Sequence, residues 1–259
     1  MRKIVLFFSI VLFIIPTQPV WAWGQEGHRI IGQIAYNHLN KKAKKHVDKV
    51  LGTHGIVYWS NWPDEIKSDT IYPDSYDWHF QDLDAGMTDE AVAATLTNYP
   101  SQGGKLWRIT DSLFAVLEKE PDNFDALRFY IHLVGDVFCP MHTAHLDDKG
   151  GNAVKLKWFG KSTNLHRIWD SDLIQSRGYS YSEYAEYLED RFAPETKEIQ
   201  KMTKPEIVIH NYHLCNEIYA YQEAGDDNTY HYIYHFAPAM EWQLYAAGIR
   251  LAQLLNELY

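Results

Sequence analysis

Residues 126–138 read ALRFYIHLVGDVF, and this apolar run indicates both the fold class and the place to look for a functional site. Its length and composition predict a buried helix, which ends before Pro140 because proline cannot continue a helix. His132 and Asp136 lie four positions apart, so both side chains leave the same face of that helix. Two ionisable groups on a buried helix are costly unless they pair with each other or bind a cation. The run therefore predicts either a His–Asp hydrogen bond or a metal site inside a helical core.

Helical periodicity extends over most of the chain. Apolar residues recur at spacings of three and four, which is typical of helices that bury one face. Five further helical faces are marked by Ile30, Ile31, Ile34 and Ala35; by Leu106, Ile109, Leu113 and Val116; by Tyr184, Leu188 and Phe192; by Val208, Tyr212, Cys215 and Tyr219; and by Met240, Leu244, Ala247, Leu251, Leu254 and Leu258. The last of these helices is expected to begin after Pro238.

One short segment has the alternation of a strand. Val154, Leu156 and Trp158 alternate with lysines and follow a Gly-Gly pair at 150–151, which predicts one strand of a small hairpin. We therefore expect a mainly α fold, a single compact helical domain with one small β hairpin.

The composition limits the classes of function. Of the 259 residues, 46% are hydrophobic and 22% are charged, which excludes a disordered chain, a collagen-like fibre and a multi-span membrane protein. A net charge of −10 argues against a broad basic surface that binds nucleic acid or anionic lipid. An anionic substrate would then need a local source of positive charge, which a metal cluster supplies. The 13 histidines could ligate such metals.

The two cysteines are too few for a disulfide framework. Cys139 and Cys215 lie outside any Cys-x-x-Cys pair. The sequence is compatible both with one disulfide between them and with two separate buried thiols.

The first 22 residues have the pattern of a secretory signal peptide. Arg2 and Lys3 give a positive start, residues 4–15 are almost entirely apolar, and Ala22 precedes the expected cleavage point. A membrane anchor would need about 20 apolar residues, more than this run has. We expect a signal peptide at residues 1–22, export to the periplasm or beyond, and no stable membrane association.

A second His–Asp pair repeats the spacing of the first. His166 and Asp170 lie four positions apart, and His142 follows the apolar helix by a short turn. Together with the first pair they give three imidazoles and two carboxylates within residues 132–170, the ligand types that zinc takes. Two buried pairs with the same spacing favour a metal site. Three more candidate ligands lie upstream: His28, Asp64 and His79.

Motifs in a fixed order give these candidates a context. They are Trp23-Gly24-x-x-Gly27-His28, Trp62-x-Asp64-Glu65, His79-Phe80-x-Asp82, Arg128-Phe129-x-x-His132-x-x-Gly135-Asp136, Pro140-x-His142, Gly150-Gly151-Asn152 and Asn164-Leu165-His166-x-x-Trp169-Asp170. The ordered set resembles the S1/P1 nuclease family of zinc-dependent phosphodiesterases, which are distantly similar to bacterial zinc phospholipase C. The resemblance implies the helical fold of that group and a catalytic domain at residues 23–259.

The resemblance also implies three zinc ions and their ligands. The first ion would take Asp64, His79, His132 and Asp136. The second would take His142, His166 and Asp170. The third would take His28, Asp136 as a bridge, and the free α-amine and carbonyl oxygen of Trp23. Removal of the signal peptide would thus create one of the ligands.

Further residues receive roles from the same resemblance. Asp64 would orient the attacking water, and Lys67 would help to stabilise the transition state. Phe80 would stack on a base and Asp82 would accept a hydrogen bond from its edge, contacts that a stacked base in a duplex does not offer. Because these base contacts need an unstacked base, single-stranded substrates should be preferred. Asn152 would help to hold phosphate.

The activity implied is that of an exported zinc nuclease. It would hydrolyse single-stranded RNA and DNA to 5′-phosphorylated products and would also act on 3′-nucleotides; no protein partner is inferred. With only two cysteines, the chain resembles a bacterial member of the family. The segment 142–150 is about one residue longer than in the fungal enzymes, which leaves the base preference open.

Two alternatives share the metal site. A zinc phospholipase C would cleave a lipid headgroup, but Phe80 with Asp82 favours a nucleotide over choline. A non-catalytic zinc-binding protein of the periplasm would need only the ligands, and the match at Asp64, Lys67 and Phe80 weighs against it.

Overall fold

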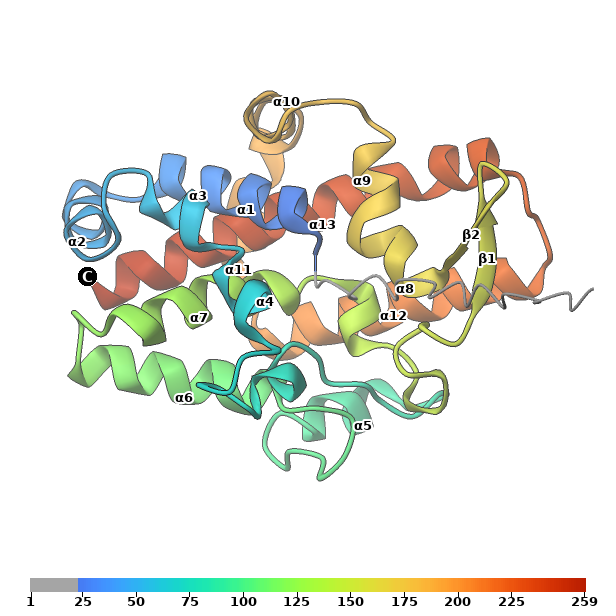
Figure 1. Cartoon of the computed structure of the whole chain (residues 1–259), viewed down its shortest axis with the longest axis horizontal. Helices are drawn as coiled ribbons and strands as arrows, with labels where there is room; N and C mark the ends of the chain where they lie inside the picture. Colours follow the sequence, from blue (N-terminus) through green and yellow to red (C-terminus); the bar gives the residue numbers. More distant parts are fainter. Residues whose placement is uncertain (1–22) are drawn as a thin grey trace, which may run out of the picture.

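The apolar run forms α7 (Phe124–Asp136) in the computed structural model, which describes residues 23–259 (Figure 1). Every residue of this helix from Ala126 to Asp136 is buried. The Asn123 side chain caps the helix by accepting a hydrogen bond from a backbone N–H of its first turn. The helix begins two residues before the predicted start and ends at Asp136, four residues ahead of Pro140. The prediction of a buried helix is confirmed.

The predicted signal peptide, residues 1–22, lies outside the described residues. Within residues 23–259, no helix combines the length and the apolar character that crossing a membrane requires.

The described residues are mostly helical. The longer helices besides α7 are α1 (Gln25–His38), α2 (Lys41–Leu51), α6 (Leu106–Lys119), α10 (Tyr181–Phe192), α12 (Lys204–Glu223) and α13 (Thr229–Leu258). The short α-helices are α3 (Gly55–Trp59), α4 (Trp62–Ile66), α5 (Asp89–Ala94), α8 (Leu165–Arg167), α9 (Leu173–Gln175) and α11 (Thr196–Lys201). Short 3₁₀ segments are η1 (Ser75–Trp78), η2 (Pro140–Thr143), η3 (Leu146–Asp148) and η5 (Ala193–Glu195), and η4 (Ile168–Asp172) is a π-helical turn. The mainly α fold predicted from periodicity is confirmed.

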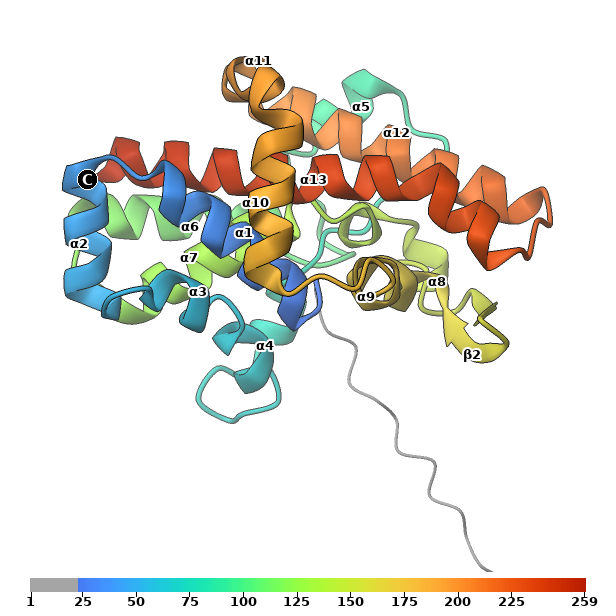
Figure 2. The same ribbon diagram turned by 90° about the horizontal axis from the view of Figure 1, so that it is seen from above.

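Helix α13 runs along the long axis of the domain, and α1 lies beside it (Figures 1 and 2). Gly248 of α13 allows this close approach, since a Cβ there would come within 2.6 Å of the Ile34 Cβ on α1. Helix α7 packs against α1, α6 and α13. The face of α7 that carries His132 and Asp136 is therefore turned into the protein interior.

The start of the last helix differs from the prediction. We expected it after Pro238, but α13 begins at Thr229, where the Asn228 side chain accepts two backbone hydrogen bonds, and it continues through the proline. Pro238 cannot donate to the carbonyl of Tyr234, which costs one helical hydrogen bond. Tyr234 is 88% exposed, so water can take that bond, and the apolar face of the helix outweighs the loss.

The predicted hairpin is present. Strand β1 (Lys155–Trp158) pairs antiparallel with β2 (Lys161–Asn164), so that Lys155 faces Asn164. The strand begins one residue after Val154, where the prediction placed its start. Phe159 and Gly160 make the turn with positive φ angles of 47° and 76°.

The cysteines are two separate buried thiols. Cys139 precedes η2, Cys215 lies within α12, and each is fully buried and unpaired with the other. Of the two arrangements compatible with the sequence, the structure has the one without a disulfide.

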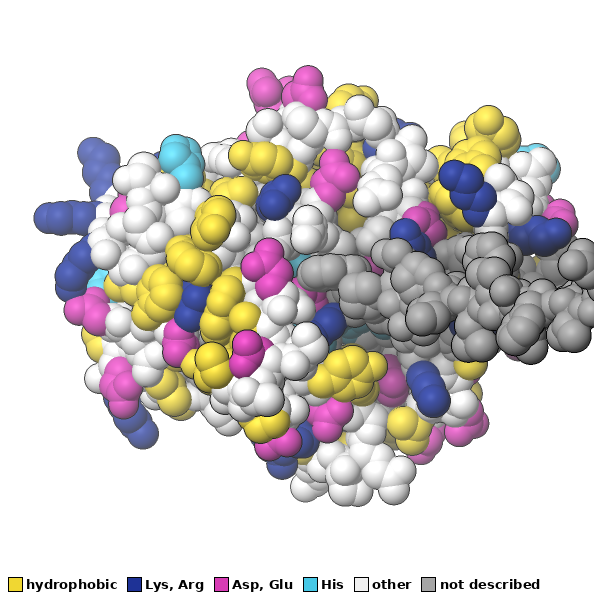
Figure 3. All heavy atoms as spheres, viewed as in Figure 1, with side chains coloured by type: hydrophobic (Ala, Val, Ile, Leu, Met, Phe, Trp, Pro, Cys, Tyr) yellow, Lys and Arg dark blue, Asp and Glu magenta, His cyan; other side chains and the backbone are white. Residues whose placement is uncertain are grey.

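The molecular surface is mixed in charge on the face shown in Figure 3. Lys and Arg side chains gather near α2 and are elsewhere interspersed with Asp and Glu. Hydrophobic side chains gather over α3, where Tyr58 is exposed.

Candidate metal centre

Eight His and Asp side chains from widely separated segments meet in the interior. Helix α7 supplies His132 and Asp136, and the other six come from α1, α4, η2, α8, η4 and the residue after η1: His28, Asp64, His142, His166, Asp170 and His79. All eight side chains are buried. Trp23, the ninth predicted ligand, is also fully buried. The structure thus brings together the eight His and Asp side chains for which the sequence predicted metal binding, and the indole of Trp23 lies beside Gly135 of α7.

The first group is formed by Asp64, His79, His132 and Asp136. His79 Nδ1 and His132 Nε2 lie 3.1 and 3.2 Å from the same oxygen of Asp136, Oδ2. Asp64 Oδ1 lies 3.7 and 3.8 Å from the same two nitrogens. Ligand atoms of a tetrahedral zinc with bonds of about 2.0–2.1 Å lie about 3.3–3.5 Å apart. The spacing of these four side chains therefore fits one such ion.

The second group is formed by His142, His166 and Asp170. His166 Nε2 lies 3.1 Å from Asp170 Oδ2, and His142 Nε2 lies 3.6 Å from Asp170 Oδ1. Cys139, for which the sequence predicted no role in the site, lies 3.5 Å from Asp170 Oδ1. Burial raises the pKa of the Cys139 thiol well above its usual range, so the thiol stays protonated and donates to Asp170.

The third group uses the other oxygen of Asp136. His28 Nε2 lies 3.3 Å from Asp136 Oδ1, and its ring stacks on the ring of His132 at 3.8 Å. Asp136 therefore faces the first group with Oδ2 and His28 with Oδ1, the arrangement of a bridging carboxylate. The Trp23 indole N–H donates to the carbonyl of Gly135 at 3.0 Å, which fixes Trp23 beside the end of α7.

Backbone carbonyls set the orientation of two imidazoles. His132 Nδ1 donates to the carbonyl of Ser60 at 2.6 Å, and His166 Nδ1 donates to that of Gly150 at 2.6 Å. Because each ring keeps its proton on Nδ1, the lone pair on Nε2 is directed into the cluster, as metal-binding histidines require. No sequence pattern marks these two carbonyls, since neither belongs to a residue type that binds metal.

Buried polar atoms without a hydrogen-bond partner gather here. They include His28 Nε2, Asp64 Oδ2, Asp136 Oδ1, His142 Nδ1 and Asp170 Oδ2. Such atoms are costly in a folded protein unless something satisfies them. Cations bound among them would do so, and the described residues contain three His/Asp/Cys groups that could hold metal ions.

The protonation states also suit metal binding. Burial and the neighbouring His132 lower the pKa of His28 to about 4, so this imidazole is neutral at pH 7. Burial by itself would raise the pKa of Asp136, but His132 and His142 outweigh it and hold the pKa well below its usual range. The pKa of Asp170 falls to about 2, because His166 and His142 likewise outweigh burial. Burial lowers the pKa of His132 and His166, but Asp136 and Asp170 outweigh it and raise the pKa of each ring, so these two imidazoles would release protons when cations bind. Neutral imidazoles and ionised carboxylates are the ligand forms that metals bind.

A cavity of about 680 Å³ opens onto the cluster, and His79, His142 and His166 form part of its wall. The other residues predicted to act in catalysis or substrate binding also line it: Lys67, Phe80, Asp82 and Asn152. Lys67 Nζ lies 3.1 Å from Asp64 Oδ1. The structure therefore places all four predicted residues at one cavity, next to the His/Asp cluster.

Glycines hold Phe80 and Asp82 in place. Gly104 has a φ of 108°, and a Cβ there would lie 2.0 Å from the Phe80 carbonyl oxygen. Gly103 has a φ of 81°, and a Cβ there would lie 2.4 Å from the Asp82 carbonyl oxygen. Asp82 is buried in the cavity wall, and this burial raises its pKa to about 8 against the opposing effect of His166.

The fold and this site define a helical protein with a buried His/Asp cluster of the kind that holds several metal ions. The chain belongs to the S1/P1 nuclease family, whose model matches residues 23–259. It is 28% identical to Endonuclease 2 of Arabidopsis thaliana over 98% of this chain and 97% of that protein. It is 27% identical to Nuclease S1 of Aspergillus oryzae over 71% of this chain and 67% of that protein. Nuclease P1 of Penicillium citrinum is 25% identical over 59% and 58% of the two chains. The family resemblance is confirmed, and membership supports nuclease activity.

Proposed function

We propose that the chain is an exported zinc-dependent phosphodiesterase that hydrolyses single-stranded RNA and DNA to 5′-phosphorylated products and also acts on 3′-nucleotides. The observation that carries this proposal is the convergence of eight buried His and Asp side chains, three of which line a cavity of about 680 Å³. Nuclease names among the relatives support the substrate class.

The proposed zinc ligands are the three groups described above, with Asp136 shared between two of them. Zinc held there supplies positive charge for the phosphoryl oxygens and lowers the pKa of water. Asp64, next to Lys67 of the cavity wall, would accept a hydrogen bond from the attacking water and so orient it. The Lys67 ammonium lies 3.1 Å from that carboxylate and adds positive charge where negative charge develops on the phosphoryl group.

The α-amine of Trp23 is the last proposed ligand. It requires cleavage after Ala22, which also implies export to the periplasm or the medium. The burial of the Trp23 side chain beside Gly135 supports a fixed position for this residue.

The proposed base site is formed by Phe80 and Asp82. Stacking on an aromatic ring contributes about 1–3 kcal/mol per base and needs an unstacked base, which favours single strands. Asp82 offers a carboxyl group to the base edge, and one of its oxygens has no hydrogen-bond partner among the described residues. Asn152 Oδ1 is likewise without a partner and lies at the same cavity, which supports a contact with substrate.

Chelation tests the proposal. EDTA followed by dialysis should abolish hydrolysis of denatured DNA and of 3′-AMP, and added zinc should restore both. Full turnover by the metal-free protein would refute a zinc mechanism. Cleavage of phosphatidylcholine in place of DNA would identify a phospholipase C, and bound zinc without any phosphodiesterase turnover would identify a zinc-binding protein.

A further inference from the structure

Lysines are concentrated at the cavity of an otherwise acidic protein. The whole chain has 24 basic and 34 acidic residues. The cavity lining reverses this ratio, with four lysines against the two carboxylates of Asp77 and Asp82. Lys67 belongs to the proposed catalytic machinery. Among the described residues, Lys105, Lys149 and Lys155 form no ion pair with the eight His and Asp side chains of the cluster.

Two of these lysines lie on the side of the hairpin. Lys149 directly follows η3 and has a φ of 60°, and its side chain is exposed. The loop beneath it is fixed by Asp148, whose Oδ1 accepts hydrogen bonds from the Gly151 N–H at 2.7 Å and the Tyr219 hydroxyl at 2.9 Å. The neighbouring carboxylate is thus directed into the loop, while Lys149 remains at the cavity mouth.

Lys155 lies at the beginning of β1 and is also exposed. It faces Asn164 across the ladder, and both residues line the cavity. Its Nζ donates to the carbonyl of Asn152 at 2.7 Å, which keeps the ammonium beside the proposed phosphate contact.

Lys105 lies on the loop that follows Gly103 and Gly104. Its backbone N–H donates to the carbonyls of Asp77 and Phe80, which fixes the residue beside the proposed base site. The side chain is 33% exposed, and its Nζ lies 3.8 Å from an Asp77 oxygen, too far for a tight ion pair. A positive charge therefore lies on this wall of the cavity too.

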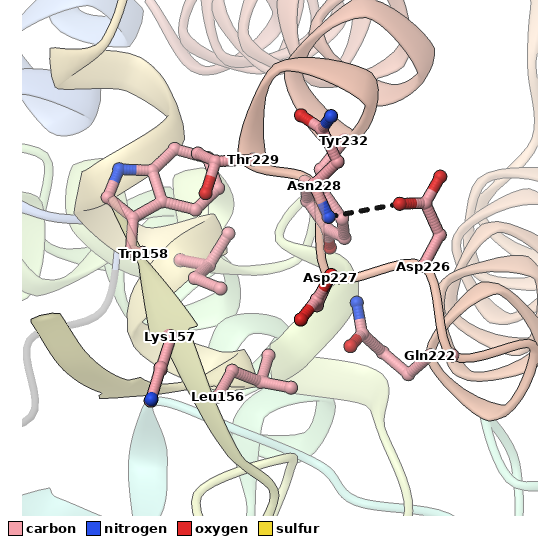
Figure 4. A pocket seen from close by; sticks show the side chains of 11 residues that line it. Leu156, Lys157, Trp158, Gln222, Asp226, Asp227, Asn228, Thr229 and Tyr232 are labelled. Atoms are coloured by element: carbon pink, nitrogen blue, oxygen red, sulfur yellow. Dashed lines mark hydrogen bonds between the residues drawn. The ribbon is translucent and has the colours of Figure 1, made fainter. Parts of the chain in front are cut away.

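The lysines further along the hairpin belong to other surfaces. Lys157 lines a separate pocket of about 170 Å³ together with Asp226 and Asp227, which Figure 4 shows between β1 and the turn that joins α12 to α13. Lys161 pairs with Trp158 and so lies on the opposite face of the hairpin from Lys155. Of the hairpin lysines, only Lys155 therefore lines the cavity.

We propose that Lys105, Lys149 and Lys155 form a phosphate-binding rim that holds the nucleotides flanking the reacting phosphate. A polynucleotide would contact the rim, whereas a 3′-mononucleotide, whose phosphate lies at the metal centre, would not. The rim therefore makes the protein selective for chains over mononucleotides. The inference rests on the proposed function for its substrate class.

The test uses the double variant Lys149→Gln/Lys155→Gln. Each phosphate contact on a single strand contributes about −0.7 to the slope of log K against log salt, which is roughly fourfold in affinity near 0.15 M salt. The double variant should bind fluorescein-labelled oligothymidylate roughly tenfold more weakly near 0.15 M salt, with a slope smaller by about 1.4. Binding is measured by fluorescence anisotropy on the zinc-loaded protein with an oligothymidylate whose phosphorothioate linkages slow hydrolysis, so this readout does not depend on turnover.

Matched variants show whether the position of the charge matters. Lys161→Gln removes the same charge from the opposite face of the hairpin and should leave oligothymidylate binding unchanged. Lys149→Arg should retain binding, and Lys149→Gln alone, which leaves the Lys155–Asn152 contact intact, should lose about fourfold. In the zinc-loaded protein, KM for the oligonucleotide should rise in the double variant while the kinetics on 3′-AMP stay unchanged.

The outcomes separate the rim from the proposed function. Unchanged binding in the double variant, an equal loss in Lys161→Gln, or an equal effect on 3′-AMP would overturn the rim. Lysine-dependent binding without any zinc-restored hydrolysis would instead overturn the proposed function and leave the rim standing.

Discussion

The shared carboxylate Asp136 gives the most discriminating prediction. Its Oδ2 lies 3.1 and 3.2 Å from His79 and His132, and its Oδ1 lies 3.3 Å from His28. One substitution, Asp136→Asn, therefore weakens two of the three proposed ion sites while keeping the size of the side chain. Asp170 faces the second group alone, so Asp170→Asn should weaken one. Zinc content should fall from about three to about one per chain in the first variant and to about two in the second.

The lost ions should also lower stability in zinc-containing buffer. An ion at 100 times its Kd stabilises the folded state by about 2.7 kcal/mol, so the loss of two costs about 5 kcal/mol. For a domain of this size 1 kcal/mol corresponds to about 2–4 °C, which predicts a Tm roughly 10–20 °C lower for Asp136→Asn. Because the deficit comes from the ions, it should largely disappear when both proteins are melted in EDTA.

Elemental analysis and calorimetry measure the two quantities. Asp74→Asn, an exposed carboxylate outside the cavity lining, is the matched control and should change neither. An unchanged zinc content in Asp136→Asn, or a Tm deficit that persists undiminished in EDTA, would refute the bridging arrangement.

Three further predictions concern the cavity. Asp64→Asn should lower kcat on single-stranded DNA by about 10²–10⁴-fold, because it removes the group that orients the water, while the far-UV circular dichroism spectrum stays unchanged. A kcat within a few fold of the parent would argue against this role. Phe80→Ala should weaken binding of single-stranded oligonucleotides by about 1–3 kcal/mol without changing zinc content, and an equal loss of zinc would show that the ring supports the metal site instead. Gly104→Ala should lower the free energy of unfolding in urea by more than about 1 kcal/mol and should raise KM. The reason is that Gly104 has a φ of 108° and a Cβ there would lie 2.0 Å from the Phe80 carbonyl oxygen. An unchanged KM would mean that this contact does not position the Phe80 ring.

Local patterns were sufficient for most of the fold. The apolar run at 126–138 predicted both ends of α7 to within two residues, and the alternation after Gly151 predicted the hairpin. The start of α13 was missed because proline is a local signal, whereas the helix is held by its apolar face against α1 and by the cap at Asn228. Tertiary packing outweighed one lost backbone hydrogen bond.

The site was predictable only in part from spacing. The four-residue separation placed His132 and Asp136 on one face, and likewise His166 and Asp170, because helical geometry is local. No spacing argument could bring His28, Asp64 and His79 to the same place, since that depends on how α1 and the α4 region fold onto α7. The family resemblance supplied those contacts.

Features set only by three-dimensional contacts were not predicted. The carbonyls of Ser60 and Gly150 orient imidazoles far away in the sequence, and any residue type can supply a carbonyl. For Cys139 the sequence was compatible with a disulfide or with a separate buried thiol, and only the fold places its sulfur 3.5 Å from Asp170 Oδ1. The lysines of the rim are unremarkable in sequence and become a group only around the cavity.

Diffraction from crystals of the purified exported protein at the zinc absorption edge tests the central claim most directly. The account predicts three anomalous peaks, each about 2.0–2.2 Å from nitrogen and oxygen atoms of its ligand group, with Asp136 next to two of them. An anomalous map without peaks among these side chains, or with peaks only on the surface, would contradict it.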